Sequence, residues 1–393
     1  MNITFLLRLW PVYGGGETVT ICLANEMIKR GWNVSVLYFK NNTRPDLPFI
    51  DPAVKAVQIP DIRCDEFTTR FPDADKVTGY LKEYIQENDI HYLINQWWPV
   101  EYIRGIRGRY KTKIVTCLHQ ALYTPMIEGT GINGFLKKRC TSLYKFWKKR
   151  HSCRQVTRFL PHTDKYIFLS PAFQHQYEQF ANHKNTNRQL GAIPNPLVYP
   201  NEIRPEDLQS KEKTVLLVGR MVEIQKRITR AIKIWSAIEN DPRLDEWNFR
   251  IVGEGPDLAM YKQLAQTLGL KRISFEGFRN PQPYYKQAAI FMMTSAFEGF
   301  PMTLVEAQQC GVVPVVMDSY LSLHDIVETG YNGIIVSNED LTGYVNKIKE
   351  LMTDTSLREK LAMNGLHSCR RFCVEEIVNN WEELFNDLSA NRR

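Results

Sequence analysis

Two glutamates near the end of the chain have a spacing that suggests chemistry. Glu298 and Glu306 lie in AFEGFPMTLVEAQQCG, residues 296–311. Helical neighbours recur at three or four residues, so these carboxylates do not simply share one helix face. Glu298 stands in a Gly-Phe-Pro turn, where it can accept hydrogen bonds from a sugar hydroxyl or simply be exposed. Thr303 followed by Glu306 fits a capping box, so a purely structural role for Glu306 at a helix start stays open.

A second group of candidate residues is cationic. Arg220 follows the apolar run TVLLVG, and Lys226 comes six residues later in VGRMVEIQKR. An Arg and a Lys at the end of a strand can clamp a diphosphate and neutralise the charge that develops on a leaving group. The alternative is an ordinary basic loop exposed to solvent.

Two glycine turns and one histidine also follow apolar runs. GGGE, residues 14–17, opens a helical segment, and free N–H groups at a helix start attract phosphate. A flexible turn is the alternative, since GxGxxG and GxxxxGK[ST] are both absent. VGEGPD, residues 252–257, is a similar turn that can close over a nucleobase. His119 ends KIVTCLH, where a structural histidine is the commoner explanation.

The elements that must position these residues alternate along the chain. Strand, helix, strand repeated over both halves is typical of two doubly wound α/β units, and 393 residues exceed one ordinary core. Residues 196–213, rich in proline and charge, are the expected linker between a first domain of residues 1–195 and a second of residues 214–373. Ligands of such sheets bind beyond the carboxyl ends of the strands, so the active site is expected in a cleft between the domains. The expected strands are NITFLL, NVSVLYF, YLIN, KIVTCLH and KYIFLS, then TVLLVGR, NFRIVGEG, ISFEGF, AIFMMTS, VPVVM and NGIIV.

Composition and spacing exclude several classes of protein. Hydrophobic content of 44% and charged content of 24% are globular values. The eight cysteines contain no CxxC and the histidines no HxxxH or HExxH, so we expect no metal or redox motif. The acidic string Asp73-Ala74-Asp75 has no strand before it, and we expect no metal there either. No run approaches the roughly eighteen apolar residues that span a bilayer, and the scattered thiols suit a cytoplasmic protein, soluble or peripheral.

One basic segment holds most of the excess positive charge. Residues 135–160 contain nine Lys or Arg and no acid, with aromatic residues between them. A cationic stretch with aromatic anchors suits an anionic membrane surface. A nucleic-acid patch and a plain solvated helix are the alternatives, and no nucleic-acid fold signature accompanies the segment. The residues expected at the membrane are Lys137, Lys138, Arg139, Lys145, Trp147, Lys148, Lys149 and Arg150.

Taken together, these motifs resemble glycosyltransferase family 4, the retaining, nucleotide-sugar-dependent enzymes of GT-B fold. The resemblance is strongest over residues 214–336, through LLVGRMVEIQKR, IVGEGPD, ISFEGF and TSAFEGFPMTLVEAQQCGVVPVV, and reaches the first domain through GGGE, LHQ and IPNP. It implies an α/β structure of two Rossmann-like domains facing across a cleft. VEEIVNNWEELFNDL resembles the family's C-terminal helix, so residues from about 374 to 393 are expected to pack back on the first domain. The chain departs from the family at Arg227, where glycine is common, and at Thr229, where Asp is frequent.

The resemblance implies which residues hold the donor diphosphate. Arg220 and Lys226 stand at the positions that bind it in the family. Gly15 and Gly16 stand where the first domain approaches the same phosphates. Such enzymes generally need no metal, so we expect no cofactor.

The resemblance also assigns the sugar and ribose contacts. Glu306 would bind the ribose hydroxyls, Glu298 would lie against the donor sugar, and His119 would lie near the reacting sugar. With Arg220 and Lys226, His119 and Glu298 form the expected catalytic set. The other expected donor contacts are Gly253, Pro256, Phe278, Gly299, Phe300, Pro301, Met302 and Thr303.

These observations lead to a functional expectation. We expect a retaining hexosyltransferase that uses a nucleoside diphosphate sugar, UDP-linked, and a glycan or lipid-linked acceptor in bacterial surface polysaccharide or lipopolysaccharide-type biosynthesis. It would be peripheral on the inner face of the cytoplasmic membrane and would bind no nucleic acid. An epimerase or phosphorylase on the same architecture is one alternative. A non-catalytic membrane-surface adaptor, which would use the basic segment and not the cleft, is the other.

Overall fold

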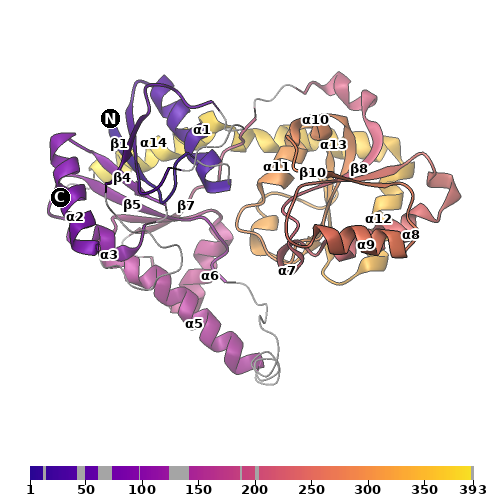
Figure 1. Cartoon of the computed structure of the whole chain (residues 1–393), viewed down its shortest axis with the longest axis horizontal. Helices are drawn as coiled ribbons and strands as arrows, with labels where there is room; N and C mark the ends of the chain where they lie inside the picture. The colour runs from indigo at the N-terminus through magenta and orange to yellow at the C-terminus, as the bar shows by residue number, and fades with distance from the viewer. Residues whose placement is uncertain are drawn as a thin grey trace. The chain divides into compact units, whose positions relative to one another are not determined.

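Two compact units make up the chain. The computed structural model describes residues 1–11, 15–41, 49–60, 73–96, 98–123, 141–185, 188–199 and 203–390. Unit 1 comprises Met1–Pro196 and Val374–Arg393, and unit 2 comprises Leu197–Cys373 (Figure 1). The expected linker, 196–213, falls almost wholly in unit 2. It contains the 3-10 helix η2 (Pro205–Ser210), and its Leu208 is buried in the core of that unit.

Unit 1 is built on a parallel sheet of seven strands. The strands are β1 (Asn2–Leu6), β2 (Asn33–Tyr38), β3 (Lys55–Gln58), β4 (Tyr92–Asn95), β5 (Lys113–Leu118), β6 (Lys165–Phe168) and β7 (Leu190–Ala192). Their order is β3-β2-β1-β4-β5-β6-β7, so the order reverses between β1 and β4. Such a reversal leaves a crevice beyond the carboxyl ends of the two central strands. The sheet therefore has the topology of a doubly wound unit.

The helices of unit 1 include the last one of the chain. They are α1 (Gly15–Lys29), α2 (Ala74–Glu87), α3 (Val100–Ile103), α5 (Thr141–Phe159), η1 (Leu160–His162), α6 (Pro171–Ala181) and α14 (Val374–Ala390). Arg30 donates to the Asn379 side chain at 2.8 Å and to the backbone oxygen of Glu375 at 2.8 Å. Tyr92 donates its hydroxyl to the backbone oxygen of Phe385 at 2.8 Å, and the two rings stack with centroids 4.1 Å apart. These contacts attach α14 to the first unit, although it follows unit 2 in the sequence.

Unit 2 is built on a parallel sheet of six strands in the order β10-β9-β8-β11-β12-β13. The strands are β8 (Glu212–Val218), β9 (Asn248–Val252), β10 (Ile273–Gly277), β11 (Ala288–Met293), β12 (Val313–Asp318) and β13 (Ile334–Ser337). The central β8 and β11 are continuous apolar runs, as expected of strands covered on both faces. The helical segments are α7 (Glu223–Lys226), α8 (Ile228–Glu239), η3 (Pro242–Leu244), α9 (Leu258–Thr267), α10 (Gln282–Gln287), α11 (Met302–Gln309), η4 (Leu321–Leu323), α12 (Leu341–Thr353), α13 (Thr355–Ser368) and η5 (Cys369–Phe372).

The predicted α/β class of two doubly wound units is confirmed. Every strand expected from the sequence is present in one of the two parallel sheets. Two strands, β3 and β7, were not expected. Both are short edge strands, and their sequences KAVQ and LGA carry little apolar signal.

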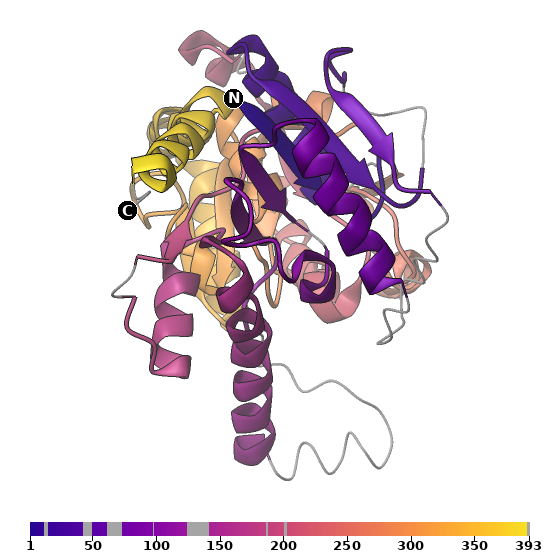
Figure 2. The same cartoon turned by 90° about the vertical axis from the view of Figure 1, so that its left-hand side faces the viewer.

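Helix α5 extends well past the sheet of unit 1, as Figure 2 shows. It holds the part of the basic segment that the structure describes; Lys137, Lys138 and Arg139 lie outside the described residues. No helix among the described residues is both long and apolar enough to cross a membrane.

Candidate active site

The unit 2 residues expected to contact a donor follow four of its strands. Because all six strands are parallel, the segments after β8, β9, β10 and β11 leave the sheet at the same edge. Arg220 comes two residues after β8, Gly253 directly after β9, Phe278 directly after β10 and Glu298 five residues after β11. The topology of the sheet therefore gathers residues that are far apart in the sequence.

An ion pair brings two of the expected catalytic residues together. Lys226 Nζ lies 2.6 Å from Glu298 Oε1, and the side chains are only 12% and 8% exposed. Gln225 donates its Nε2 to the other Glu298 oxygen at 3.3 Å, and Arg220 donates to Gln225 Oε1 at 3.0 Å. Arg220, Lys226 and Glu298 thus form one network, with Gln225 as the bridge. Two cations and one carboxylate leave one positive charge in excess, which suits an anionic ligand.

Backbone contacts fix the two segments that carry this network. The backbone N–H of Ala296 donates to the backbone oxygen of Gln225 at 2.7 Å. The Thr294 hydroxyl lies 3.1 Å from the backbone oxygens of both Lys226 and Arg227. The first residues after β11 are therefore bound to the end of α7, just ahead of Glu298. Gln225 and Thr294 were not predicted, and their only signal in the sequence is that they adjoin predicted site segments.

The glycine turn after β9 packs directly on the loop after β8. A Cβ added to Gly253 would lie 2.0 Å from the backbone oxygen of Gly219, and one added to Gly255 would lie 2.5 Å from that of Met221. Both glycines have positive φ, 141° and 159°. The turn therefore needs glycine for this close approach between loops. Pro256 beside it is exposed, as is Phe278, and their expected contact with a nucleobase stays a prediction.

Glu306 has very different surroundings from Glu298. It lies within α11, almost fully buried, and its Oε2 accepts a hydrogen bond from the Tyr285 hydroxyl at 3.0 Å. Burial penalises the charged form and raises the pKa of Glu306 to about 7, although the hydrogen bond from Tyr285 works in the opposite direction. Its carboxyl group therefore changes charge close to neutral pH.

The expected capping box at Thr303 and Glu306 is wrong. Helix α11 begins at Met302, Pro301 occupies the N-cap position, and no side chain caps the helix. Thr303 is the second residue of the helix and Glu306 the fifth, so Glu306 faces the core instead of reaching back to the helix start. A proline at the cap position and the buried Tyr285 overrode the local pattern. The expected contacts Gly299, Phe300, Pro301, Met302 and Thr303 form the turn and first residues of this helix.

Lys211 holds the two helices that carry the Tyr285–Glu306 pair. Its Nζ donates to the backbone oxygens of Tyr285, Lys286 and Cys310, at 3.0, 2.8 and 2.6 Å. Two of these oxygens belong to α10 and the third follows α11. Burial lowers the pKa of Lys211 to about 8. Nothing in the local sequence indicated this role, because the contacts join positions 74 to 99 residues apart.

The remaining expected donor contacts belong to unit 1. Gly15 and Gly16 are the first residues of α1, which follows β1. His119 comes directly after β5, and the carboxyl ends of β1 and β5 lie at the same edge of this sheet. Burial lowers the pKa of His119 to about 4, so the imidazole is neutral at neutral pH. The acidic string is at the start of α2, with Asp73 before the helix and Asp75 in its first turn.

The two residues that depart from the family pattern, Arg227 and Thr229, both make local contacts in the structure. Arg227 has φ of 49° and ψ of 45°, the left-handed conformation that glycine adopts without strain. Its guanidinium lies 3.3 Å from Glu339. Thr229 donates its hydroxyl to Glu223, the first residue of α7. Both residues therefore contribute to local packing around α7.

Replacing Glu306 by glutamine should remove a pH-dependent cost of folding. The folded-state pKa of about 7 lies above the unfolded value, so the folded protein binds this proton more tightly. The wild-type free energy of unfolding should therefore fall, relative to Glu306→Gln, as the pH rises from about 4.5 to 7. The relative loss should be about 3 kcal/mol, at about 1.4 kcal/mol for each pKa unit. Denaturant unfolding of the full chain at pH 5 and pH 8 measures it.

Two variants serve as controls for this measurement. Tyr285→Phe removes the hydrogen bond that favours the carboxylate, so the pH range of the decline should extend upwards. Glu206→Gln changes an exposed carboxylate on η2 and should leave the pH dependence unchanged. An equal difference between wild type and Glu306→Gln at both pH values would contradict the raised pKa.

Two family models match adjacent parts of the chain. The model described as Glycosyltransferase Family 4 matches residues 13–196, and the one described as Glycosyl transferases group 1 matches residues 199–367. TarM from S. aureus, in a crystal structure with Fondaparinux, alpha-GlcNAc-glycerol and UDP, has a TM-score of 0.72. It is 14% identical, and the match covers 98% of this chain and 99% of that one. The fold of the two chains is therefore the same.

Relatives differ in how much of their length this chain spans. It is 28% identical over 207 residues to the exopolysaccharide phosphotransferase SCO2592 of Streptomyces coelicolor, which covers 52% of this chain but only 21% of that protein. It is 22% identical over 392 residues, 99% of both chains, to an alpha-1,4-N-acetyl-D-galactosaminyltransferase of Campylobacter jejuni. The name of that enzyme specifies GalNAc-alpha-(1->4)-GalNAc-alpha-(1->3)-diNAcBac-PP-undecaprenol as the molecule it acts on. With two adjacent family models and a shared GT-B fold, the chain belongs to the glycosyltransferases of the family 4 type.

Proposed function

We propose that this glycosyltransferase moves a hexose from a nucleoside diphosphate sugar to a hydroxyl of a glycan or lipid-linked acceptor, with retention of the anomeric configuration. The observation that carries the proposal is the network of Arg220, Gln225, Lys226 and Glu298 at the carboxyl edge of the unit 2 sheet. Cations there suit a diphosphate, and a carboxylate suits sugar hydroxyls. The buried Glu306 adds a second acceptor for hydroxyl groups.

The role proposed for Arg220 and Lys226 is to stabilise the departing diphosphate. As the bond between the anomeric carbon and the phosphate oxygen breaks, negative charge grows on that oxygen, and cations already in place lower the barrier. In this structure Lys226 is neutralised by Glu298, whereas Arg220 donates to the neutral amide of Gln225. A bound diphosphate would draw Lys226 towards itself and leave Glu298 free to accept from the sugar.

The two glutamates are proposed to hold different parts of one donor. Glu298 would orient the hexose, since it stands beside the diphosphate cations. Glu306 would accept from the ribose hydroxyls, with Tyr285 fixing one of its oxygens and leaving the other for the ligand. The carboxylates are therefore not proposed as a general acid and base.

The proposed bond changes follow a front-face route. The acceptor oxygen bonds to the anomeric carbon on the face from which the diphosphate leaves, and the acceptor proton passes to the departing phosphate oxygen. Such a route needs no carboxylate nucleophile from the first domain and retains the configuration. His119, neutral because of its low pKa, would offer an N–H to the sugar and not a charge. We keep the prediction that no metal takes part.

Names and titles of similar proteins support finer parts of the proposal. The TarM structure contains UDP, which supports a UDP-linked donor here. The Campylobacter jejuni relative acts on a glycan carried by undecaprenol diphosphate, which supports a lipid-linked acceptor and a role in bacterial surface glycan biosynthesis. A lipid-linked acceptor is met at a membrane, so we propose a cytoplasmic enzyme that is peripheral on the inner face of the membrane.

Alanine variants should separate the two glutamates. Glu306→Ala should raise KM for the donor with a smaller change in kcat, because it removes a contact that is equally present before and during transfer. Glu298→Ala and Lys226→Ala should lower kcat by about a hundredfold or more, the size expected for a group aimed at charge in the transition state. Steady-state kinetics with the nucleotide sugar that gives turnover measures both.

The exposed carboxylate variant Glu206→Ala is the matched control and should retain wild-type values. Full cellular function in both Lys226→Ala and Glu298→Gln would instead favour the non-catalytic adaptor. Release of free nucleoside diphosphate only when an acceptor is present would argue against an epimerase or phosphorylase.

The stereochemistry of the product tests the retaining mechanism. Proton NMR of the new glycosidic linkage should show the anomeric configuration of the donor. An inverted linkage would sink the retaining mechanism, although glycosyl transfer itself would stand.

A further inference from the structure

The end of α5 that lies away from the sheet displays large apolar side chains. Leu143, Phe146 and Trp147, all in its first two turns, are 58%, 55% and 54% exposed. The rings of Phe146 and Trp147 contact each other, with centroids 6.0 Å apart. Three such residues together are unusual on a surface helix, because exposing them to water is unfavourable. We call these three residues the apolar tip.

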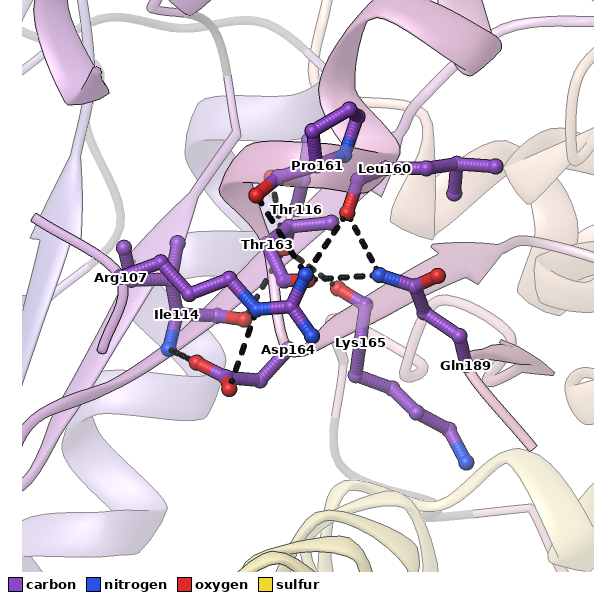
Figure 3. A network of polar contacts seen from close by, with 9 residues as sticks. All are labelled: Arg107, Ile114, Thr116, Leu160, Pro161, Thr163, Asp164, Lys165 and Gln189. Carbon is purple, nitrogen blue, oxygen red and sulfur yellow. Dashed lines mark hydrogen bonds and ion pairs between the residues drawn. The ribbon is translucent and has the colours of Figure 1, made fainter. Parts of the chain in front are cut away.

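The opposite end of the helix is anchored in unit 1. Helix α5 passes directly into η1, where the backbone oxygen of Leu160 accepts from Arg107 at 3.1 Å and from Gln189 at 2.6 Å (Figure 3). Arg107 also lies 3.4 Å from Asp164, whose other oxygen accepts from the backbone N–H of Ile114 at 2.8 Å. This network ties the helix base to β5 and to the residues just before β6 and β7. The apolar tip is therefore carried by a helix with a fixed base.

Packing against α6 holds the middle of the helix and orients it. The hydroxyls of Thr157 and Tyr177 lie 3.0 Å apart, and Cys153 and Val156 are buried. Lys149 Nζ lies 4.4 Å from the centre of the Phe180 ring, so this lysine faces α6 and not the exposed surface. Lys149 is only partly exposed, and its expected place on the membrane surface stays a prediction.

The three residues of the apolar tip and two arginines form one stripe along the helix. Leu143, Phe146, Trp147, Arg150 and Arg154 have the spacing i, i+3, i+4, i+7 and i+11, which places them on one face. With about 1.5 Å of rise per residue, Arg150 stands about 10 Å and Arg154 about 16 Å along the axis from Leu143. Apolar groups thus come first along the helix, and guanidinium groups follow about two and three turns further from its tip.

The lysines and arginines of α5 are not balanced by any acidic residue in the helix. Its nineteen residues contain no Asp or Glu, and Lys145, Lys148, Arg150 and Arg154 are at least partly exposed. Arg150 and Arg154 are a like-charge pair at i, i+4, a spacing that weakens a helix. An external anionic surface would offset this repulsion.

We propose that α5 is a membrane-docking helix, whose apolar tip enters the headgroup boundary of a bilayer that contains anionic phospholipid, while Arg150, Arg154, Lys145 and Lys148 contact the lipid phosphates. The combination of a hydrophobic end and cations further along the same helix favours a bilayer. A nucleic acid would match the charge but would give the exposed Leu143 no apolar environment. The inference deepens the membrane location proposed above, but it does not depend on sugar transfer.

Flotation with vesicles tests the docking helix. The full chain should float with vesicles of phosphatidylcholine containing 30 mol% phosphatidylglycerol and much less with phosphatidylcholine alone. The double variant Phe146→Ser/Trp147→Ser should bind the anionic vesicles at least tenfold more weakly. The double variant Arg150→Gln/Arg154→Gln should lose about fivefold for each charge removed, and 0.5 M NaCl should reproduce that loss.

Controls distinguish this surface from a general effect of charge or hydrophobicity. Lys262→Gln/Lys360→Gln removes two exposed cations from unit 2, and Leu268→Ser removes an exposed apolar residue there; both should bind as wild type does. Brominated phosphatidylcholine in the anionic vesicles should quench Trp147 fluorescence. Trp147→Phe should still float but should lose that quenching. Thermal unfolding verifies that each variant is folded.

Three outcomes would overturn the proposal, whatever the result of the kinetic assays. The first is equal flotation with neutral and anionic vesicles. The second is undiminished binding by Phe146→Ser/Trp147→Ser. The third is displacement from vesicles by a 20-mer DNA duplex without any quenching by brominated lipid, which would make the surface a nucleic-acid patch.

Discussion

The ion pair between Lys226 and Glu298 fixes the positions of α7 and of the loop after β11, the two segments that carry the candidate site of unit 2. Taking two charges out of water is costly, and a buried pair contributes little to stability unless its geometry and remaining hydrogen bonds are good. Here the 2.6 Å contact is supported by Gln225, and the backbone bond from Ala296 locks the two segments together. The same segments need glycine at position 253, where the loops after β8 and β9 touch. This arrangement fixes the positions of Lys226 and Glu298 and contributes little to the stability of the fold.

The second glutamate shows how environment gives one residue type two properties. The Glu298 carboxylate pairs with the ammonium group of Lys226, whereas the Glu306 carboxyl group accepts from the neutral phenol of Tyr285. Burial without a cation is enough to bring the pKa of Glu306 to about 7. Lys211 stabilises this environment because it donates to a backbone oxygen in α10 and to another directly after α11. A spacing of eight residues therefore separates two sites of different electrostatics.

Topology explains why so much of this site was predictable from the sequence. Central strands such as β8 and β11 are continuous apolar runs, and in a parallel sheet whatever follows them reaches the same edge. Arg220 and Glu298 could be identified in that way. Tyr285 and Lys211 could not, because their roles come from contacts between distant segments. The predicted capping box was wrong for a related reason. The local pattern was present, but the Glu306 carboxylate accepts a buried hydrogen bond from Tyr285 instead of bonding to the helix start.

Two places where this chain breaks local rules lie on the surfaces for which we propose function. A non-glycine residue in left-handed conformation at Arg227 follows Lys226, and a nearly buried ion pair lies beside it. Helix α5 breaks two further rules, since it exposes Trp147 and its neighbours and carries no acid to balance its cations. A sequence selected only for folding would avoid such features, because consistent local preferences favour a single folded state. Under our two proposals, a diphosphate would bind the cations beside Arg227, and an anionic bilayer would offset the charge of α5 and cover its apolar tip. The proposed donor and the proposed membrane contact would then offset two separate energetic costs of this fold.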